Sequence, residues 1–584
     1  MLPPSPPPGS MAALRVAFFM AFGVLFASTA LAQLDPNIIA PVVPRQTEPR
    51  PEIPGPVLDS EDLPIGARSL PRIHIPVDDP TASALSGGTI TVRGFRFLGN
   101  TLHSDEDLAA VTNAYVGVGR RYSALLEARD RVTRLYIDSG YISSGAILGQ
   151  QDYADGIVEL TIVEGMLTNI EFETDGRLRE RYFTSRINPR GEALNVNDLR
   201  ERLRRLKRDP RVDAITAELL PGDERGDSVL SIVVEEATPY WSAASFDNYT
   251  PESIGGLRGY FRGGHRNITG WGETFTAAYG IAEGLHDLDL RFDAPVTRFD
   301  TTLGFTVRRS WAEIVEEPLD ALDIENKTEA YGIRLEQPVL RRRGEEARLF
   351  VAGEWKRGRT FIAGERGFGG DDTNRGKSTI TVLRTGGDYL LRLQKRAFAA
   401  RITASFGIDV LSATPAVSAE TIDTPDGKFI TGLIQLQEVE YLPWNDMRLQ
   451  TRIDAQVVDG AIPALEQFGL GGNASVRGFR ENLAVRDQGV VGSVELRIPV
   501  AVIGPIESLE FGVFTDSGYG RYRDSATGSE ATTLVSIGFG VHADITPYIR
   551  TSIEWAKDLK EKGVKSQNDL QDDGLHFSLQ ARFP

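Results

Sequence analysis

From about residue 240 onward, apolar and polar residues alternate in short segments separated by Gly, Asp and Asn. The last segment shows the pattern. Polar residues separate its apolar residues, which are Leu575, Phe577, Leu579, Ala581 and Phe583. Strands of about ten residues cross a bilayer when tilted. If each strand and its connection take about 20 residues, the alternating region contains about 16 strands. The pattern predicts a transmembrane antiparallel β-barrel over residues 239–584. A large soluble β domain with one wet face is the alternative.

Two copies of one strand–helix–helix–strand–strand unit precede this region. The first copy, residues 89–165, has expected strands at 89–98, 144–150 and 157–163 and expected helices at 104–115 and 125–140. The second copy, residues 166–238, has expected strands at 169–173, 215–220 and 228–235 and expected helices at 178–187 and 197–207. Helical spacing of apolar residues and the N-cap residue Ser104 carry these assignments. The sequence therefore predicts two α+β modules followed by an all-β domain.

The N-terminal 32 residues have the features of a secretory signal peptide. Arg15 precedes an apolar run that begins at Val16, and Ala30-Leu31-Ala32 supplies the small residues of a cleavage site, so the mature chain is expected to begin at Gln33. Met1 and Met11 both remain open as the start. Residues 33–88 contain eleven prolines up to Pro80, which predicts an extended linker without a long helix.

Composition excludes several functional classes. The 584 residues include no cysteine and carry a net charge of -17, so a thiolate site is impossible and a nucleic-acid partner is not expected. The six histidines lack metal-ligand spacing, and no hydrolase or metalloprotease motif is present. We expect no catalytic residues, cofactor, metal or nucleotide.

One glycine-rich segment between two predicted strands stands out. It runs from Phe468 to Glu481 and carries Arg477, which offers five hydrogen-bond donors. Further along, Phe514 and Asp516 occupy inward positions of a strand whose alternate residues are apolar, so Asp516 can meet Arg477 inside the barrel. Without other information, a solvated arginine in a surface loop is the simpler interpretation.

These segments resemble known motifs. Val476-Arg477-Gly478-Phe479 is similar to the Val-Arg-Gly-aromatic motif on the long sixth loop of the polypeptide-transport barrel superfamily, and Phe514-x-Asp516-x-Gly518 is similar to its Phe-x-Asp-x-Gly strand motif. The resemblance also includes Phe246-Asp247-Asn248-Tyr249, Gly255-Gly256 and Asn267-Ile268-Thr269-Gly270. The whole mature chain resembles the two-partner secretion transporters of the hemolysin secretion/activation type.

The resemblance implies a fold and a function. The two modules would be polypeptide-transport-associated (POTRA) domains in the periplasm, and the loop would fold back into the pore with Arg477 held to Asp516. The protein would be an outer-membrane pore that secretes a large adhesin- or hemolysin-type exoprotein, which the POTRA domains capture unfolded by strand addition. Outer-membrane lipid and, during biogenesis, the barrel-assembly machinery are the other implied partners. Family members often carry a plug helix, for which the proline-rich linker leaves little room.

Two other functions remain open. An insertase that assembles other barrels would share the barrel and the loop motif, but such proteins typically carry more than two POTRA domains. A passive porin or an adhesin would explain the barrel and would leave the two modules and both motifs unexplained.

Overall fold

A computed structural model describes residues 89–584, apart from residues 188–191, 343, 368–375, 415–416, 419–422, 425–426, 445, 501–503, 505, 524–530, 561–568 and 584. The signal peptide predicted for residues 1–32 and the linker predicted for residues 33–88 lie outside the described residues. No described helix is long and apolar enough to span a membrane. The described chain forms two compact units: a barrel from Tyr240–His265 and Thr274 onward, and an N-terminal unit that ends at Pro239 and includes Arg266–Glu273.

The first module keeps the predicted order of helices and strands, but the single strand predicted at 89–98 is divided into two strands of different sheets, and one strand is added. Its elements are β1 Thr89–Val92, β2 Gly94–Leu98, α3 Asp105–Thr112, the 3-10 turn η1 Asn113–Tyr115, β3 Gly117–Arg121, α4 Tyr122–Asp138, β4 Gly145–Ile147 and β5 Ile157–Val163. Ser104 caps α3 by accepting a hydrogen bond from the Asp107 amide. The addition is β3, which pairs with β1; its Gly-Val-Gly-Arg-Arg sequence lacks the alternation by which strands were predicted.

The second module repeats the arrangement around its own core. Its elements are β6 Met166–Thr174, α5 Glu180–Ile187, α6 Val196–Lys207, β7 Val212–Pro221 and β8 Asp227–Glu236, with the sheet order β6-β8-β7. Phe183, Leu203 and Ile232 are buried between the helices and the sheet. The turn at Asn267–Gly270 belongs to this unit, because the amide of Arg179 donates to the carbonyl of Gly270 over 3.0 Å.

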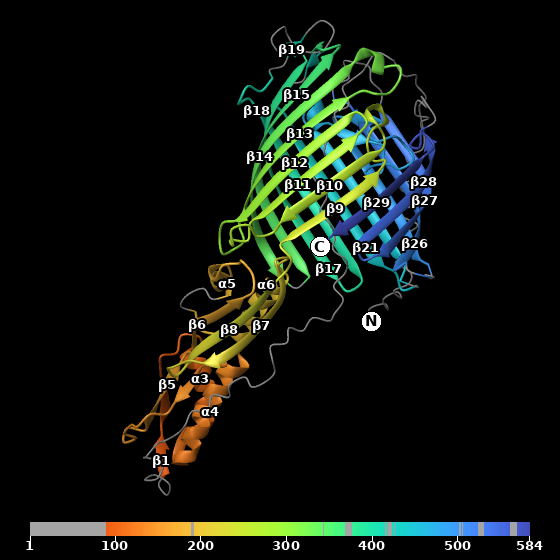
Figure 1. The fold of residues 1–584 in the computed structure, drawn as a ribbon. Helices are drawn as coiled ribbons and strands as arrows, with labels where there is room; N and C mark the ends of the chain where they lie inside the picture. Colours follow the sequence, from red (N-terminus) through yellow and green to blue (C-terminus); the bar gives the residue numbers. More distant parts are fainter. Residues whose placement is uncertain are drawn as a thin grey trace, which may run out of the picture. The chain divides into compact units, whose positions relative to one another are not determined.

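Sixteen long antiparallel strands form the closed barrel (Figure 1). They are β9 Tyr240–Asp247, β10 Arg258–His265, β11 Thr274–Ala282, β12 Leu285–Pro295, β13 Thr302–Glu313, β14 Ile324–Arg342, β15 Glu345–Ile362, β17 Lys377–Leu393, β18 Arg396–Ile408, β21 Ile430–Tyr441, β22 Arg448–Val458, β25 Gln488–Pro499, β26 Ser508–Arg521, β27 Thr532–Thr546, β28 Ile549–Lys560 and β29 Leu575–Phe583. The two-residue strand β16, Glu365–Arg366, pairs only with the end of β15. The predicted strand number is confirmed.

Alternation places apolar residues outside and polar residues inside. On β26, Phe511 and Val513 are exposed on the outer face, whereas Phe514 and Asp516 are buried on the inner face. Two strands are much longer than the expected length of about ten residues: β14 has 19 residues and β15 has 18. The outer residues at their ends, such as Lys327 and Arg359, are charged, so these ends extend beyond the apolar band.

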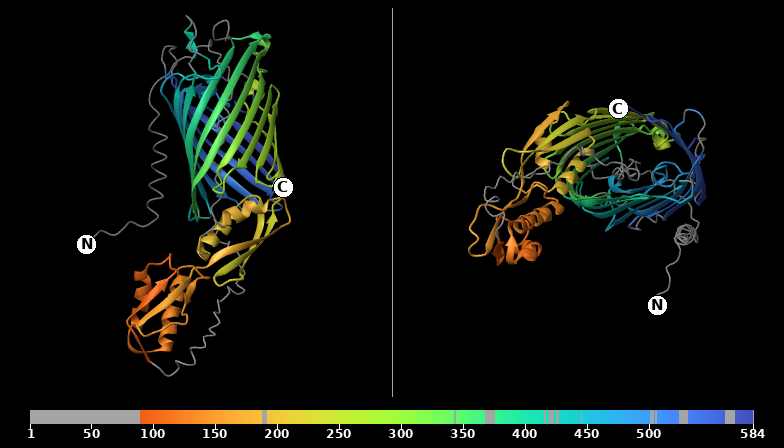
Figure 2. Two further views of the ribbon diagram at one scale, coloured as in Figure 1. Left: turned by 90° about the vertical axis from the view of Figure 1, so that its left-hand side faces the viewer. Right: turned by 90° about the horizontal axis from the view of Figure 1, so that it is seen from below.

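The connection between β22 and β25, residues 459–487, folds into the barrel; we call it the pore loop. It includes the turn η4 Ala464–Glu466 and the strands β23 Phe468–Leu470 and β24 Ala484–Arg486. In the view along the barrel, this connection lies within the ring of strands (Figure 2, right). Its buried apolar side chains pack against inward residues of the strands; Val476 and Phe479 share a cluster with Val491, and Leu465 shares one with Ile380. The barrel interior therefore contains a packed core.

The seam of the barrel joins its first and last strands. β9 and β29 pair in register from Phe583↔Ser242 to Ser578↔Asp247. The side chain of Asn248 continues the ladder beyond this point: its amide donates to the carbonyl of Leu575 over 2.8 Å and its oxygen accepts from the amide of Phe577 over 2.8 Å. Asn248 thus supplies the two hydrogen bonds that a further strand residue would make.

Candidate functional site: the pore loop and its anchors

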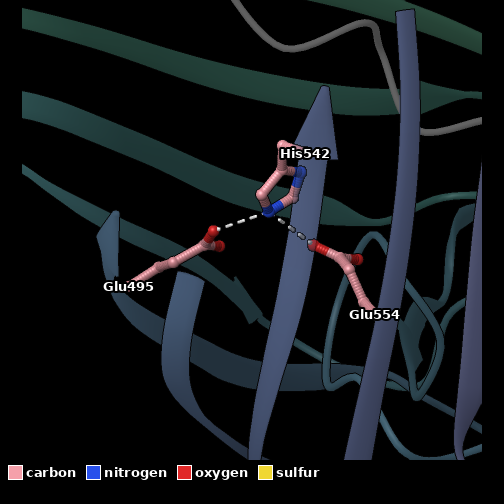
Figure 3. A group of neighbouring side chains, drawn as sticks. All are labelled: Glu495, His542 and Glu554. Carbon is pink, nitrogen blue, oxygen red and sulfur yellow. Dashed lines mark hydrogen bonds and ion pairs between the residues drawn. The ribbon is translucent and has the colours of Figure 1, made fainter. Parts of the chain in front are cut away.

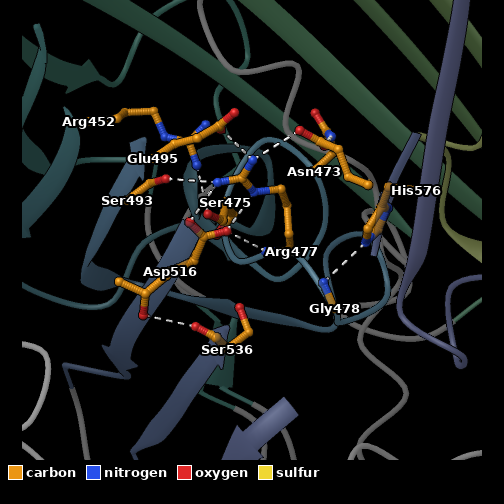
Figure 4. Close-up of polar contacts among 12 residues, drawn as sticks. Arg452, Asn473, Ser475, Arg477, Gly478, Ser493, Glu495, Asp516, Ser536 and His576 are labelled. Carbon is orange, nitrogen blue, oxygen red and sulfur yellow. Dashed lines mark hydrogen bonds and ion pairs between the residues drawn. The ribbon is translucent and has the colours of Figure 1, made fainter. Parts of the chain in front are cut away.

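Arg477 lies at the tip of the pore loop, buried against the inner wall (Figure 4). Its Nε and Nη2 atoms donate to the two carboxylate oxygens of Asp516 over 2.8 and 3.0 Å, and its backbone amide donates to the same carboxylate over 3.0 Å. Nη1 donates to Glu495 over 2.7 Å and to Glu554 over 3.0 Å, and Nη2 also donates to Ser493 over 3.2 Å. All five donors of the guanidinium are therefore used.

The remaining motif residues shape the seat of Arg477. The guanidinium carbon lies 3.3 Å from the ring centroid of Phe514, so a cation–π contact adds to the ion pairs. Gly478 has φ +87°, and a Cβ atom there would lie 2.9 Å from the Cβ of Ala556. A Cβ atom on Gly518 would lie 2.8 Å from the Cγ2 of Val476. Glycine at both positions lets the loop tip approach the wall closely.

Glu495, His542 and Glu554 form a group with the donor types of a metal site (Figure 3). His542 Nε2 lies 3.1 Å from Glu495 Oε1 and 3.7 Å from Glu554 Oε1. Arg477 already donates to both carboxylates and supplies the positive charge that a metal ion would bring. The group therefore serves as the receptor of the arginine, and a metal would have to displace it.

A second anchor holds the stem of the pore loop to the wall. Glu466 is fully buried; both of its carboxylate oxygens accept from Arg384 Nη2, over 2.8 and 2.9 Å, and one accepts from Lys356 over 3.1 Å. Arg384 lies on β17 and Lys356 on β15, whereas Asp516 lies on β26. The loop is therefore tied to two separate parts of the wall.

A third anchor lies where the pore loop meets neighbouring connections. Arg480 donates to both oxygens of Asp572 over 2.6 and 2.7 Å, to Asp569 over 2.5 Å and to Glu316 over 2.7 Å. Burial, together with the negative charge of Asp569, raises the pKa of nearby Glu252 to about 7 against the opposing effect of Arg480. We call these five residues the outer cluster; it gathers three connections around one arginine.

Gln571 links the pore loop to the barrel seam. Its amide nitrogen donates to the carbonyls of Asn248 and Thr250 over 2.9 and 2.7 Å, and its oxygen accepts from the backbone amide of Glu481 over 2.8 Å. Gln571 is fully buried. One side chain thus bonds both the end of β9 and the pore loop.

Sequence reasoning found part of this site. The structure places Val476, Arg477, Gly478 and Phe479 together on the pore loop and brings Phe514, Asp516 and Gly518 to it from β26. Sequence reasoning missed Glu495 and Glu554 as partners of Arg477, and it missed Glu466, Gln571 and the outer cluster. Glu495 and Glu554 are single carboxylates at inward strand positions, and that pattern alone does not distinguish them from other lumenal acids.

The chain matches models of two known protein families. A family model described as haemolysin secretion/activation protein ShlB/FhaC/HecB matches residues 226–543, more than half of the chain. A model of the ShlB-type POTRA domain matches residues 90–165.

Individual relatives match over different spans. The outer membrane transporter CdiB of Dickeya dadantii is 32% identical over 174 residues, a match that covers 30% of each chain. The hemolysin transporter protein ShlB of Serratia marcescens is 22% identical over 436 residues, which cover 70% of this chain and 73% of the relative. The solved structure of CdiB from Escherichia coli has the same fold, with a TM-score of 0.62, 18% identity and coverage of 88% of this chain and 94% of that one. The chain spans less than a third of the Dickeya dadantii relative.

Proposed function

Because the chain belongs to the haemolysin secretion/activation protein family (ShlB/FhaC/HecB), we propose that it is the translocation pore of a two-partner secretion pair. It is an outer-membrane protein with its POTRA domains in the periplasm. The chain enters β9 directly after the second POTRA domain, so Tyr240 marks the periplasmic end and the pore loop the extracellular end. A large exoprotein would enter unfolded from the periplasm, cross the lumen and fold outside.

The observation that carries this proposal is the seat of Arg477. Here ion pairs to Asp516, Glu495 and Glu554 hold the loop. When these ion pairs break, a hydrophilic environment stabilises the separated charges better than an apolar one. A polar chain that fills the lumen could therefore replace these contacts, which makes the loop a suitable gate.

Strand addition at the POTRA domains supports capture of the partner. In the second domain β6 and β7 are the edges of the sheet, and β7 is ten residues long. An unpaired edge offers backbone donors and acceptors to an extended chain without reading its sequence. An unfolded β-rich exoprotein is a suitable ligand for such an edge.

The direct test is secretion into the medium. The protein is expressed in an outer membrane with and without the candidate exoprotein encoded nearest its own gene, and the medium is assayed for that exoprotein. We expect the exoprotein outside the cell only when the transporter is intact. Its absence from the medium, together with loss of other outer-membrane barrels on deletion, would instead identify an insertase.

A locked seam distinguishes the pore from the insertase more sharply. Ser245 and Gln580 are directly paired inward residues across the seam, so a Ser245→Cys/Gln580→Cys disulfide suits their Cα separation of about 5 Å. The natural chain has no cysteine to interfere. Secretion through the lumen should continue at the wild-type rate with the seam oxidised. Loss of activity that reduction restores would indicate a mechanism that opens the seam.

A further inference from the structure

Basic side chains gather on one side of the barrel, on its outer face near the extracellular end. Five outward positions on neighbouring strands β13, β14, β15 and β17 are basic: Arg309, Lys327, Arg357, Arg359 and Lys377. The corresponding outward positions of β26, β27 and β28 are Tyr519, Arg521, Thr533, Val535, Lys557 and, past a bulge at Leu559, Lys560, which pairs with Val535. Three basic residues are thus spread over three strands there, whereas five lie close together on β13–β17.

The cluster lies directly above the apolar band of the same strands. Along β14 the outward residues change from Leu335 and Ile333 to Tyr331, and the next outward positions are charged. The rings of Tyr331 and Trp355 lie 5.7 Å apart and form an aromatic step between the two zones. Aromatic residues occupy the boundary between hydrocarbon and head groups in outer-membrane barrels. The basic residues therefore lie at the level of lipid head groups.

Three of the five cations, Arg309, Arg357 and Lys377, have no acidic partner within salt-bridge distance among the described residues. Lys327 bonds Glu325 over 2.7 Å and Arg359 bonds Glu329 over 3.2 Å. Glu313, at the end of β13, is the remaining outward acid nearby. The cluster keeps a positive excess toward the membrane.

The aromatic step also orients these two arginines. Arg309 Nη2 donates to the hydroxyl of Tyr331 over 2.9 Å, and the guanidinium of Arg357 lies 4.6 Å from the ring centroid of Trp355. Their strands are separated by β14, which places the two backbones about 10 Å apart. A guanidinium held on a ring keeps most of its N–H groups available, and its fork matches a phosphate group.

We propose that this face of β13–β17 is a binding site for a phosphorylated lipid of the outer leaflet, with Arg309 and Arg357 as its phosphate ligands. The lipid chains would lie along Leu335, Ile333 and Tyr331 while the head group meets the arginines. The proposal goes beyond protein secretion and does not depend on it, since it concerns only the membrane face of the barrel.

The test measures lipid binding to the purified full-length protein by native mass spectrometry, with bisphosphorylated lipid A and its dephosphorylated form as probes. Arg309→Gln/Arg357→Gln should weaken binding of the bisphosphorylated lipid on the order of 30-fold, because each basic residue near an anionic lipid contributes a factor of about five. The control pair Arg521→Gln/Lys557→Gln removes the same charge from the outer face of β26 and β28 and should leave binding within about twofold.

Three results would overturn the site. These are equal binding of the dephosphorylated lipid, an equal loss in the control pair, or displacement of the lipid by millimolar inorganic phosphate, which would indicate a site for a soluble anion. An unchanged temperature at which the barrel loses its compact electrophoretic form shows that both double variants fold.

Discussion

Arg477 of the pore loop and Asp516 of β26 form a bidentate ion pair inside the barrel, with Nε 2.8 Å from Oδ2 and Nη2 3.0 Å from Oδ1. The remaining donors of the same guanidinium reach Glu495 on β25 and Glu554 on β28. One residue of the loop thus forms ion pairs with three buried carboxylates of the wall. The loop position and the charge balance of the lumen are therefore coupled.

This coupling predicts that lysine cannot replace Arg477. A lysine keeps the charge but presents one ammonium group, which cannot form a bidentate bond with Asp516 and reach both glutamates. Leaving a buried carboxylate without its partner costs about 3–5 kcal/mol. We expect Arg477→Lys to insert as a folded barrel and to secrete at least tenfold less exoprotein than the wild type, measured by immunoblot of the medium.

Arg497→Lys is the matched control, because Arg497 bonds Glu495 over 2.6 Å from the wall rather than from the loop. It should secrete within about twofold of the wild type, since Lys near a carboxylate keeps most of a single ion pair. Normal secretion by Arg477→Lys would show that the bidentate geometry has no role.

The pair Arg477–Asp516 was implied by the resemblance of the two motifs; alternation alone places Asp516 inward but does not bring Arg477 to it. The partners Glu495 and Glu554 could not be predicted. Whether an inward carboxylate lies level with the loop tip depends on the register between strands, which the length and shape of each hairpin set. The outer cluster was still harder to predict from the sequence, because Glu316 and Asp569 lie in connections more than 80 residues away from Arg480.

Loss of the stem anchor should give a different phenotype from loss of the contacts at the loop tip. Glu466→Gln removes the charge that holds Arg384 and Lys356, and both cations then share Glu354, which lies 3.2 Å from Arg384 and 3.0 Å from Lys356. We expect the stem to detach while the tip stays bound, so the open-pore conductance in planar bilayers should rise severalfold. The thermal stability of the barrel should change little, because its strand ladder is unaffected.

Glu346→Gln provides the comparison for the stem. Glu346 pairs with Arg392 over 2.7 Å, at the periplasmic end of β15 and away from the pore loop. It removes one lumenal carboxylate without releasing the stem and should leave the conductance near that of the wild type. Equal conductance changes in both variants would attribute the effect to lumenal charge rather than to the loop.

Because Gln571 bonds both the seam and the pore loop, loss of its hydrogen bonds should loosen the two together. Gln571→Met keeps the side-chain length and loses three hydrogen bonds, each of which contributes about 1 kcal/mol. We expect faster hydrogen exchange both at Asn248 and at Glu481, and a lower temperature of barrel unfolding.

The Ser245→Cys/Gln580→Cys disulfide separates the two effects of Gln571→Met. It should restore the unfolding temperature by holding the seam, and it should leave exchange at Glu481 fast because the bond to the loop is still missing. Slow exchange at Glu481 in the cross-linked variant would mean that the seam, and not Gln571, holds this part of the loop.

The outer cluster predicts that stability at the extracellular end depends on pH. Glu252 has a pKa raised to about 7 in the folded protein, above its ordinary value of 4.5, so the folded state favours the protonated form. The stabilisation is fully present below the ordinary value and is lost as the pH rises through 7, because the ionised carboxylate then faces Asp569, Glu316 and Asp572. We expect wild-type protein to expose the connection around Glu252 to added protease more at pH 8 than at pH 5.5. Glu252→Gln should resist equally at both values, since its neutral amide mimics the protonated acid; a variant that kept the full pH dependence would assign it to another group.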